Sequence, residues 1–255
     1  KRMESSHKQA GNFFDVTADA DGILRITPGE DKESYLTDPV LWLEKLAALM
    51  ITLLDPAKQI TGILYHSKGS ELPLNYKALF NAATHQDFYG RLQKVAEWAS
   101  VIRQAKTPII SVITGKQDSR TLAPALWSHY IIGTNDARIH FPEANFGIMP
   151  LIGATVPAII RTSLEQSIQL LIKGTALNSR EATAAGLIDQ LCSEQTQALK
   201  MTADWIAGDP TSYVMPSDSK SQMADADLQP VLEAFKRKAN LKYPGIYSCF
   251  ELIKA

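Results

Sequence analysis

One carboxylate has a sequence setting that suits proton transfer. Glu143 is the one acidic residue between Asp136 and Glu165, and it follows Pro142 in a segment that is otherwise apolar and interrupted by glycine and proline. Removal from water favours the neutral carboxylic acid, which raises its pKa and makes it a better proton shuttle near neutral pH. The same residue could instead cap or ion-pair a turn, because perturbed carboxylates are only enriched at functional sites.

Other residue types that carry chemistry give weaker signals. His66, His129 and His140 are dispersed, and none lies at metal-ligand spacing with an acidic residue or a cysteine, so no metal site is predicted. Ser119 does not stand in a Gly-x-Ser-x-Gly elbow, which argues against a serine nucleophile. The basic run 236–238 is typical of a solvated helix face.

The elements that must position Glu143 alternate between strands and helices. Apolar runs at 60–65, 108–113 and 129–132 predict buried central strands, and segments 13–18 and 22–27 predict a hairpin. Helices are expected at 37–54, 72–80, 89–104, 119–127, 156–160, 163–172, 179–185, 196–207, 228–240 and 243–253. This alternation favours a parallel sheet with helical crossovers.

One helix start after Glu143 has a specific signature. Asn178 and Glu181 have the spacing of a capping box, so a helix is expected to begin there. Gly186 is expected to end that helix, and the run 187–191 is expected to follow as a strand.

Composition excludes several classes of function. The chain has 255 residues, 45% of them hydrophobic and 21% charged, with a net charge of −1, so no electrostatic footprint for nucleic acid exists. The two cysteines, Cys192 and Cys249, form no disulfide framework or metal cluster, as expected for a reducing cytosol. No signal peptide and no membrane span are expected, which predicts a cytoplasmic protein.

Two segments resemble a known family. Residues 137–150, ARIHFPEANFGIMP, resemble the part of the enoyl-CoA hydratase/isomerase (crotonase) superfamily that places a catalytic glutamate over an acyl-CoA thioester. Residues 173–189, KGTALNSREATAAGLID, are similar to the segment that follows it. The resemblance implies an α/β, crotonase-like fold of repeated ββα units with a C-terminal helical region. It also implies that Glu143 is catalytic, that the small-molecule partner is an acyl-CoA substrate, and that no separate cofactor is needed.

Composition and the resemblance together divide the chain into four parts. A flexible segment, a crotonase-like core, a linker and a C-terminal helical segment are expected at 1–12, 13–207, 208–227 and 228–255. Residues 235–253 resemble the segment after the hydratase domain of bifunctional fatty-acid oxidation proteins, where basic residues can meet CoA phosphates. A downstream 3-hydroxyacyl-CoA dehydrogenase domain or a homo-oligomer is therefore an expected partner, although these 255 residues contain no Gly-x-Gly-x-x-Gly fingerprint.

The chain departs from the family where an enolate would be stabilised. By this resemblance, residues 66–77 and 108–125 correspond to the family's two oxyanion segments, which puts Leu74 and Arg120 at the backbone oxyanion-hole positions in place of small residues. Arginine does not permit the close backbone approach that glycine permits. The first of the family's two glutamates is replaced by Ala123, which cannot transfer a proton.

These departures leave two functional hypotheses. Hydration that uses two glutamates is lost, whereas isomerisation that uses Glu143 alone, in an enzyme of fatty-acid oxidation, remains chemically accessible. The alternative is a catalytically inactive crotonase-fold domain that serves assembly or acyl-CoA binding.

Overall fold

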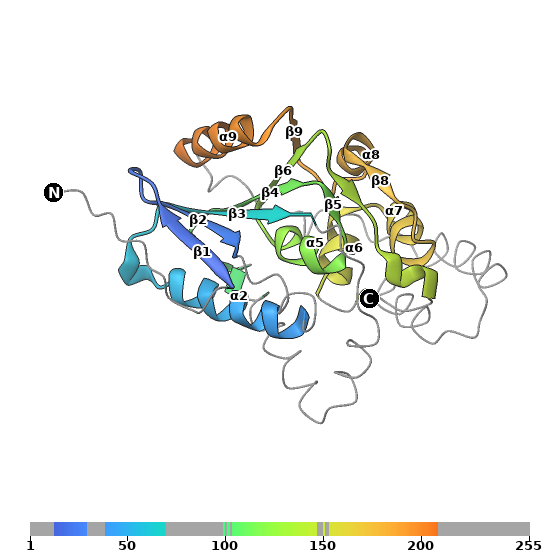
Figure 1. Ribbon diagram of the computed structural model, residues 1–255, viewed down its shortest axis with the longest axis horizontal. Helices are drawn as coiled ribbons and strands as arrows, with labels where there is room; N and C mark the ends of the chain where they lie inside the picture. Colours follow the sequence, from blue (N-terminus) through green and yellow to red (C-terminus); the bar gives the residue numbers. More distant parts are fainter. Residues whose placement is uncertain are drawn as a thin grey trace, which may run out of the picture.

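The computed structural model describes residues 13–29, 39–69, 99, 101–102, 104–146, 150 and 153–208 (Figure 1). The strands are β1 (Phe14–Ala18), β2 (Ile23–Pro28), β3 (Gly62–Lys68), β4 (Ile109–Thr114), β5 (Lys116–Gln117), β6 (Tyr130–Thr134), β7 (Arg138–Ile139), β8 (Leu177–Asn178) and β9 (Gln190–Cys192). The α-helices are α2 (Pro39–Leu53), α5 (Ser119–Leu126), α6 (Thr155–Arg161), α7 (Leu164–Ser167), α8 (Ser179–Ala184) and α9 (Gln195–Ala207). Three short helical segments add to these: η1 (Pro56–Lys58), η2 (Pro142–Phe146) and the π-helical η3 (Ile168–Ile172).

A six-stranded sheet forms the centre of the described residues. Its strand order is β1-β2-β3-β4-β6-β9, with β1 antiparallel to β2 and all other neighbours parallel. The predicted hairpin is confirmed, and the Asp19 carboxylate accepts a hydrogen bond from the amide of Ile23 at 2.9 Å across its turn. The three predicted central strands are also confirmed, because β3, β4 and β6 each pair on both sides.

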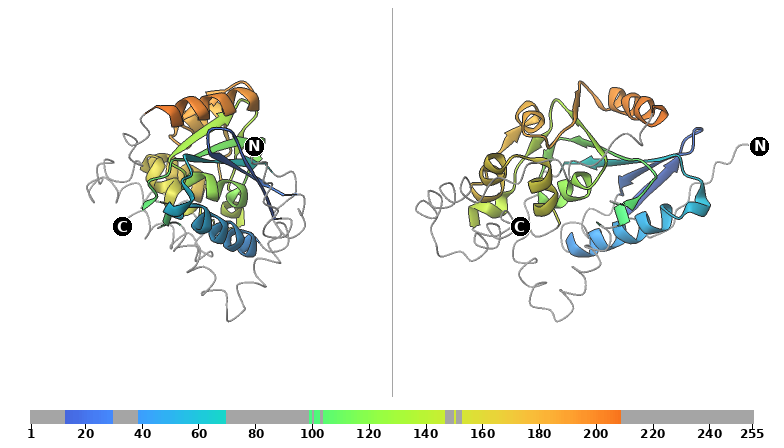
Figure 2. Two further views of the ribbon diagram at one scale, coloured as in Figure 1. Left: turned by 90° about the vertical axis from the view of Figure 1, so that its left-hand side faces the viewer. Right: turned by 180° about the vertical axis from the view of Figure 1, so that it is seen from behind.

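Helices cover both faces of this sheet. Figure 1 shows α2 and α9 on opposite sides of the strands, and the second view of Figure 2 shows the same arrangement from behind. Alternation along β3 explains the two layers, since successive side chains of a strand point to opposite faces. Ile63 and Tyr65 join the core beneath α2 together with Leu46. Leu64 joins the core beneath α9 together with Ala198.

A second, three-stranded sheet organises the region around Glu143. Its order is β5-β7-β8, with β5 parallel to β7 and β7 antiparallel to β8. It borders a separate apolar core to which α5, α6, α8 and η3 contribute, including the fully buried Leu122, Phe141 and Ala158. The segment that carries Glu143 therefore lies beside a packed apolar core.

Two local predictions need correction. The strand expected at 187–191 begins only at Gln190, because the amide of Leu187 donates at 2.9 Å to the carbonyl of Ala182 and is thereby held at the end of α8. The helix expected at 163–172 changes type within its length. Lys173 bonds to the carbonyl five residues earlier, at Ile168, so its second half is π-helical.

Several expected elements cannot be compared. The helix at 72–80, most of the helix at 89–104 and all of 209–255 lie outside the described residues. The expected linker and C-terminal helical segment therefore stay predictions. Within the described ranges, no helix combines the length and apolar composition that crossing a bilayer requires.

Candidate active site

The small sheet brings Ser119 and Glu143 together. In the parallel pair of β5 and β7, Gln117 lies opposite Ile139, and the Gln117 carbonyl accepts a hydrogen bond from the amide of His140 at 2.9 Å. Neighbouring parallel strands end at the same edge of a sheet. Just beyond that edge, the segment after β5 enters α5 at Ser119. The segment after β7 enters η2, which carries Glu143.

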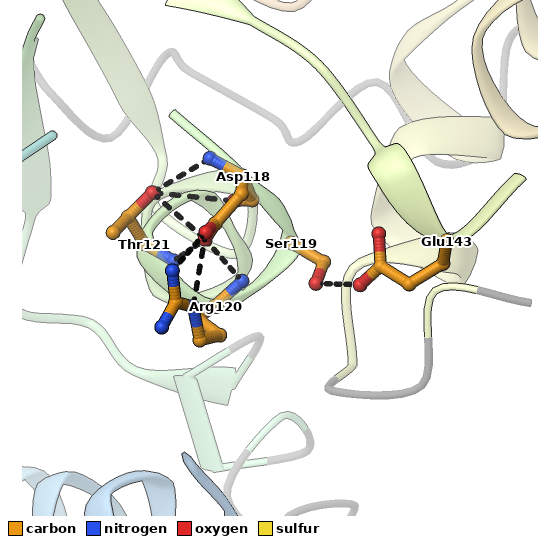
Figure 3. A network of polar contacts seen from close by, with 5 residues as sticks. All are labelled: Asp118, Ser119, Arg120, Thr121 and Glu143. Atoms are coloured by element: carbon orange, nitrogen blue, oxygen red, sulfur yellow. Dashed lines mark hydrogen bonds and ion pairs between the residues drawn. The ribbon is translucent and has the colours of Figure 1, made fainter. Parts of the chain in front are cut away.

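The hydroxyl of Ser119 donates a hydrogen bond to Oε1 of Glu143 (Figure 3). Neither residue is exposed to solvent, and within the described part of the chain Oε2 of Glu143 has no hydrogen-bond partner. Buried polar atoms without a partner are uncommon in proteins and mark places where a ligand or a strained group belongs. Oε1 of Glu143 thus accepts a hydrogen bond from Ser119, whereas Oε2 can still accept or donate one.

The pKa of Glu143 is raised, as the sequence predicts for a buried carboxyl group. Desolvation is the dominant cause that raises the pKa of Glu143 from 4.5 to about 7. The hydrogen bond from Ser119 and the positive charge of Arg120 act in the opposite direction, while the negative charge of Asp118 adds to the increase. A carboxyl group with this pKa exists in both protonation states near neutral pH, so it can accept a proton and return it.

Asp118 caps the helix that carries Ser119. Its Oδ1 accepts hydrogen bonds from the backbone amides of Arg120 at 3.0 Å and Thr121 at 3.2 Å. Thr121 completes a capping box, because its hydroxyl accepts a hydrogen bond from the Asp118 amide at 3.0 Å. The amide of Arg120, which the family resemblance assigns to the oxyanion hole, is therefore already donating to a carboxylate.

The side chain of Arg120 is folded back onto the same carboxylate. Its Nε donates to Oδ2 of Asp118 at 2.9 Å, and its Nη2 forms an ion pair with the same oxygen. Only 1% of Arg120 is exposed. Figure 3 shows this pair on one side of α5 and Ser119 pointing from the other side towards Glu143. The guanidinium therefore fills protein interior next to α5 and does not face Glu143.

The remaining predicted positions are less informative. Ala123 is fully buried in α5, four residues after Ser119 and hence on the same helix face. Its methyl group supplies no acid or base there. Leu74, the other expected oxyanion position, lies outside the described residues. The structure thus joins Glu143 to the helix that carries Arg120 and Ala123, and the catalytic assignments themselves stay predictions.

Two residues of this site were not predicted from the sequence. Asp118 and Thr121 have the Asp-x-x-Thr spacing of a helix cap, a signal that was readable. No sequence signal points to the pairing of Ser119 with Glu143, because it joins residues 24 apart through a sheet of very short strands.

The buried His66 and the partly buried His129 both have structural partners. Burial lowers the pKa of His66 to about 4, and its ring nitrogens lie 3.4 Å from Oγ1 of Thr114 and 3.2 Å from Nε2 of Gln195. Nδ1 of His129 accepts a hydrogen bond from the amide of Ile109 at 3.0 Å. Among the described residues, no three His, Cys, Asp or Glu side chains are grouped so as to hold a metal ion.

Comparison with known proteins relates this geometry to a family. The family model described as enoyl-CoA hydratase/isomerase matches residues 75–243, more than half of the chain. The peroxisomal bifunctional enzyme of Danio rerio is 29% identical over 97 residues, which cover 37% of this chain and 13% of that enzyme. The enoyl-CoA isomerase/hydratase fer4 of Mycosarcoma maydis is 28% identical over 122 residues, which cover 44% of each chain. The chain thus spans less than half the length of either relative.

A solved structure supports the fold. The enoyl-CoA hydratase from Thermoplasma volcanium superposes with a TM-score of 0.66 over 94% of this chain and 90% of its own, at 19% sequence identity. At that identity the likeness shows the fold alone, and it confirms the crotonase-like α/β architecture expected from the sequence. The match to the family model adds the family itself: the chain belongs to the enoyl-CoA hydratase/isomerase family.

Proposed function

We propose that this chain binds a fatty acyl-CoA thioester and moves a carbon–carbon double bond along the acyl chain, with Glu143 as its single proton-transferring group. The observation that carries the proposal is the buried Glu143 carboxyl, whose pKa is raised to about 7 and whose Oε2 lacks a hydrogen-bond partner within the described residues. Hydration also needs a second group to handle the proton of water, and Ala123 stands where the family has that glutamate.

The proposed step is a 1,3-proton transfer that balances without a co-reactant. Ionised Glu143 takes a proton from the carbon next to the thioester carbonyl of a 3-enoyl-CoA, and the electron pair passes into a dienolate. The protonated carboxyl returns that proton to the fourth carbon, so the double bond comes to lie between the second and third carbons. A single carboxyl group suffices, since it is regenerated in its ionised form at the end of each cycle.

Stabilisation of the enolate requires the Asp118 carboxylate to leave the backbone amide of Arg120. The resemblance assigns the donors to the amides of Leu74 and Arg120, and the Arg120 amide donates a hydrogen bond to Asp118 at 3.0 Å. A thioester oxygen that uses this amide therefore has to replace the Asp118 carboxylate there.

The biological setting belongs to the same proposal. A role in fatty-acid oxidation is supported by the similarity to a bifunctional enzyme and to an isomerase/hydratase. The CoA thioester is the substrate in this reading, and no separate cofactor takes part. A downstream dehydrogenase domain and a homo-oligomer are proposed as partners on the strength of the sequence resemblance.

Substrate assays test the proposal directly. Conversion of a 3-enoyl-CoA to the conjugated 2-enoyl-CoA is expected, and Glu143→Gln should slow it by about 10²–10⁴-fold. Glu165→Gln, an exposed acidic position on α7, is the matched control and should leave the rate unchanged. Isomerisation that survives Glu143→Gln would place the chemistry on another residue.

A specific observation favours a second candidate, a domain that binds an acyl-CoA or serves assembly without turnover. Asp118 occupies the Arg120 amide, and its negative charge would oppose an enolate at the same place. This candidate predicts acyl-CoA binding in calorimetry without conversion of either 2-enoyl or 3-enoyl substrates. The double variant Asp118→Gly with Arg120→Gly frees the backbone amide of residue 120, and glycine is tolerated as an N-cap. Turnover that appears only in this double variant would support the second candidate.

A further inference from the structure

We propose that Ser119 is a positioning residue for Glu143. Its hydroxyl holds Oε1 of the carboxylate and leaves Oε2 as the oxygen that exchanges the proton with the substrate. The inference rests on the proposed function for the identity of the reaction, but the hold of Ser119 on Glu143 can be measured without any turnover.

Both partners of the Ser119–Glu143 hydrogen bond are held in place by their own elements. Ser119 is the first residue of α5, which Asp118 caps through two backbone amides. Glu143 follows β7, and β7 pairs with β5, the strand that precedes Ser119. Both side chains are fully buried, so water does not compete for the hydrogen bond between them. A carboxyl group held in this way keeps one orientation through a reaction cycle.

Ser119 lies one helical turn before Ala123 on α5. Side chains on a helix lean towards its N-terminus, so a glutamate at position 123 would extend over the turn that begins with Ser119. The hydroxyl of Ser119 therefore lies in the direction in which the family's first glutamate would reach. Here a neutral donor takes the place of a second acid, which suits a reaction that needs one proton-transferring group held still.

The Ser119 hydroxyl also favours the ionised form of Glu143. A hydrogen bond donated to a carboxylate stabilises its charged form. Within the described residues the other charges that act on Glu143 are those of Asp118 and Arg120, which oppose each other in their effect and are bound to one another. Removal of the Ser119 hydroxyl leaves these two charges in place. The pKa of Glu143 should then rise further above 7, so a smaller fraction of Glu143 would be ionised at neutral pH.

Carboxyl titration by NMR tests the inference on the whole chain. Protein labelled with ¹³C at the glutamate side-chain carboxyl is titrated, and the resonance missing from Glu143→Gln identifies Glu143. Ser119→Ala and Ser119→Gly should both raise its pKa by roughly one to two units, the effect of losing a hydrogen bond to a charged group. Ser111→Ala removes a buried hydroxyl that bonds to Ser128 instead, and it should leave the Glu143 titration unchanged.

Kinetics provide a second readout. In Ser119→Ala, kcat for isomerisation should fall by about 10–10²-fold through loss of orientation, with KM little changed, and the rising limb of the pH–rate profile should move to higher pH. Ser119→Thr, which keeps the hydroxyl, should restore both the titration and the profile. An unshifted or lowered pKa of Glu143 in both the alanine and glycine variants would overturn the inference.

Intact-mass measurement separates this role from covalent catalysis. An acyl group attached to Ser119 after incubation with an acyl-CoA would make Ser119 a nucleophile and would also overturn the inference. If the wild-type chain isomerises no substrate while the titration shifts as expected, the proposed reaction fails and the hold of Ser119 on Glu143 stands.

Discussion

The carboxylate of Asp118 accepts a hydrogen bond at 3.0 Å from the backbone amide of Arg120, the amide that the family resemblance assigns to the oxyanion hole. The same carboxylate is ion-paired with the Arg120 side chain. The backbone amides at the N-terminus of α5 thus donate their hydrogen bonds to the Asp118 carboxylate. This arrangement explains how an arginine can replace a glycine of the family pattern without leaving an uncompensated buried charge.

The Asp118–Arg120 pair should contribute more to stability than an ordinary helix cap. Asp118→Ala removes the cap and the partner of a buried guanidinium, so the free energy of unfolding should fall by at least about 3 kcal/mol. Asn178→Ala removes the equivalent cap of α8, where the cap hydrogen bonds are exposed, and should cost about 1 kcal/mol. Urea unfolding of both variants measures the difference, and equal losses would show that the Arg120 charge is not stabilised by Asp118.

Glu143 should make folding stability depend on pH. Its pKa is raised in the folded chain to about 7 from 4.5, so between these values the folded state binds a proton that the unfolded state has released. The stabilisation is therefore complete below pH 4.5 and is lost as pH rises through 7, by about 3 kcal/mol in total. Denaturant unfolding from pH 4.5 to 8 should show this decline in the wild type. Glu143→Gln should show a flatter dependence, and parallel curves would contradict the raised pKa.

Hydration of crotonyl-CoA should be absent or very slow. The missing proton-transfer group at Ala123 alone accounts for a loss of about 10²–10⁴-fold relative to an enzyme with two glutamates. Ala123→Glu alone should not restore hydration, since the new side chain would extend towards the Ser119–Glu143 hydrogen bond and Arg120 keeps its bulk.

A combined variant sharpens this prediction. Ala123→Glu with Ser119→Gly and Arg120→Gly frees space on α5 and returns these three positions to the family pattern, so measurable hydration is expected, read by loss of the conjugated thioester absorbance. Efficient hydration by the unmodified chain would show that the second glutamate is dispensable here.

Gly186 should be the least replaceable glycine of the site's supporting core. It has φ +87°, and a Cβ built there would lie 2.4 Å from the carbonyl oxygen of Arg161. Gly115 has φ +66°, and among the described residues a Cβ built there would meet the Cα of Gly69 first, at 3.8 Å. Its replacement therefore isolates the conformational part of the penalty. Gly115→Ala should cost about 1–2 kcal/mol and Gly186→Ala at least about 3 kcal/mol in thermal or urea unfolding. Similar costs would show that the backbone at Gly186 relaxes.

The sequence alone determined the order of the main elements and the family. Apolar runs fixed β3, β4 and β6, because a strand buried on both faces needs consecutive apolar residues. Asn178 and Glu181 fixed the start of α8, because a capping box depends only on residues three apart. The isolation of Glu143 among apolar residues also predicted its raised pKa, since desolvation follows from burial.

Tertiary structure decided what the Glu143 carboxylate touches. Its partner Ser119 comes from a separate segment, and β5 and β7, which bring that segment beside Glu143, are two residues long and have no readable periodicity. The end of α8 was equally undetermined, because Leu187 is as apolar as a strand residue while its amide bonds back to the helix. Local patterns specify which residues are buried and where helices begin. The partners of a buried polar group depend on pairing between distant segments, which no local pattern encodes.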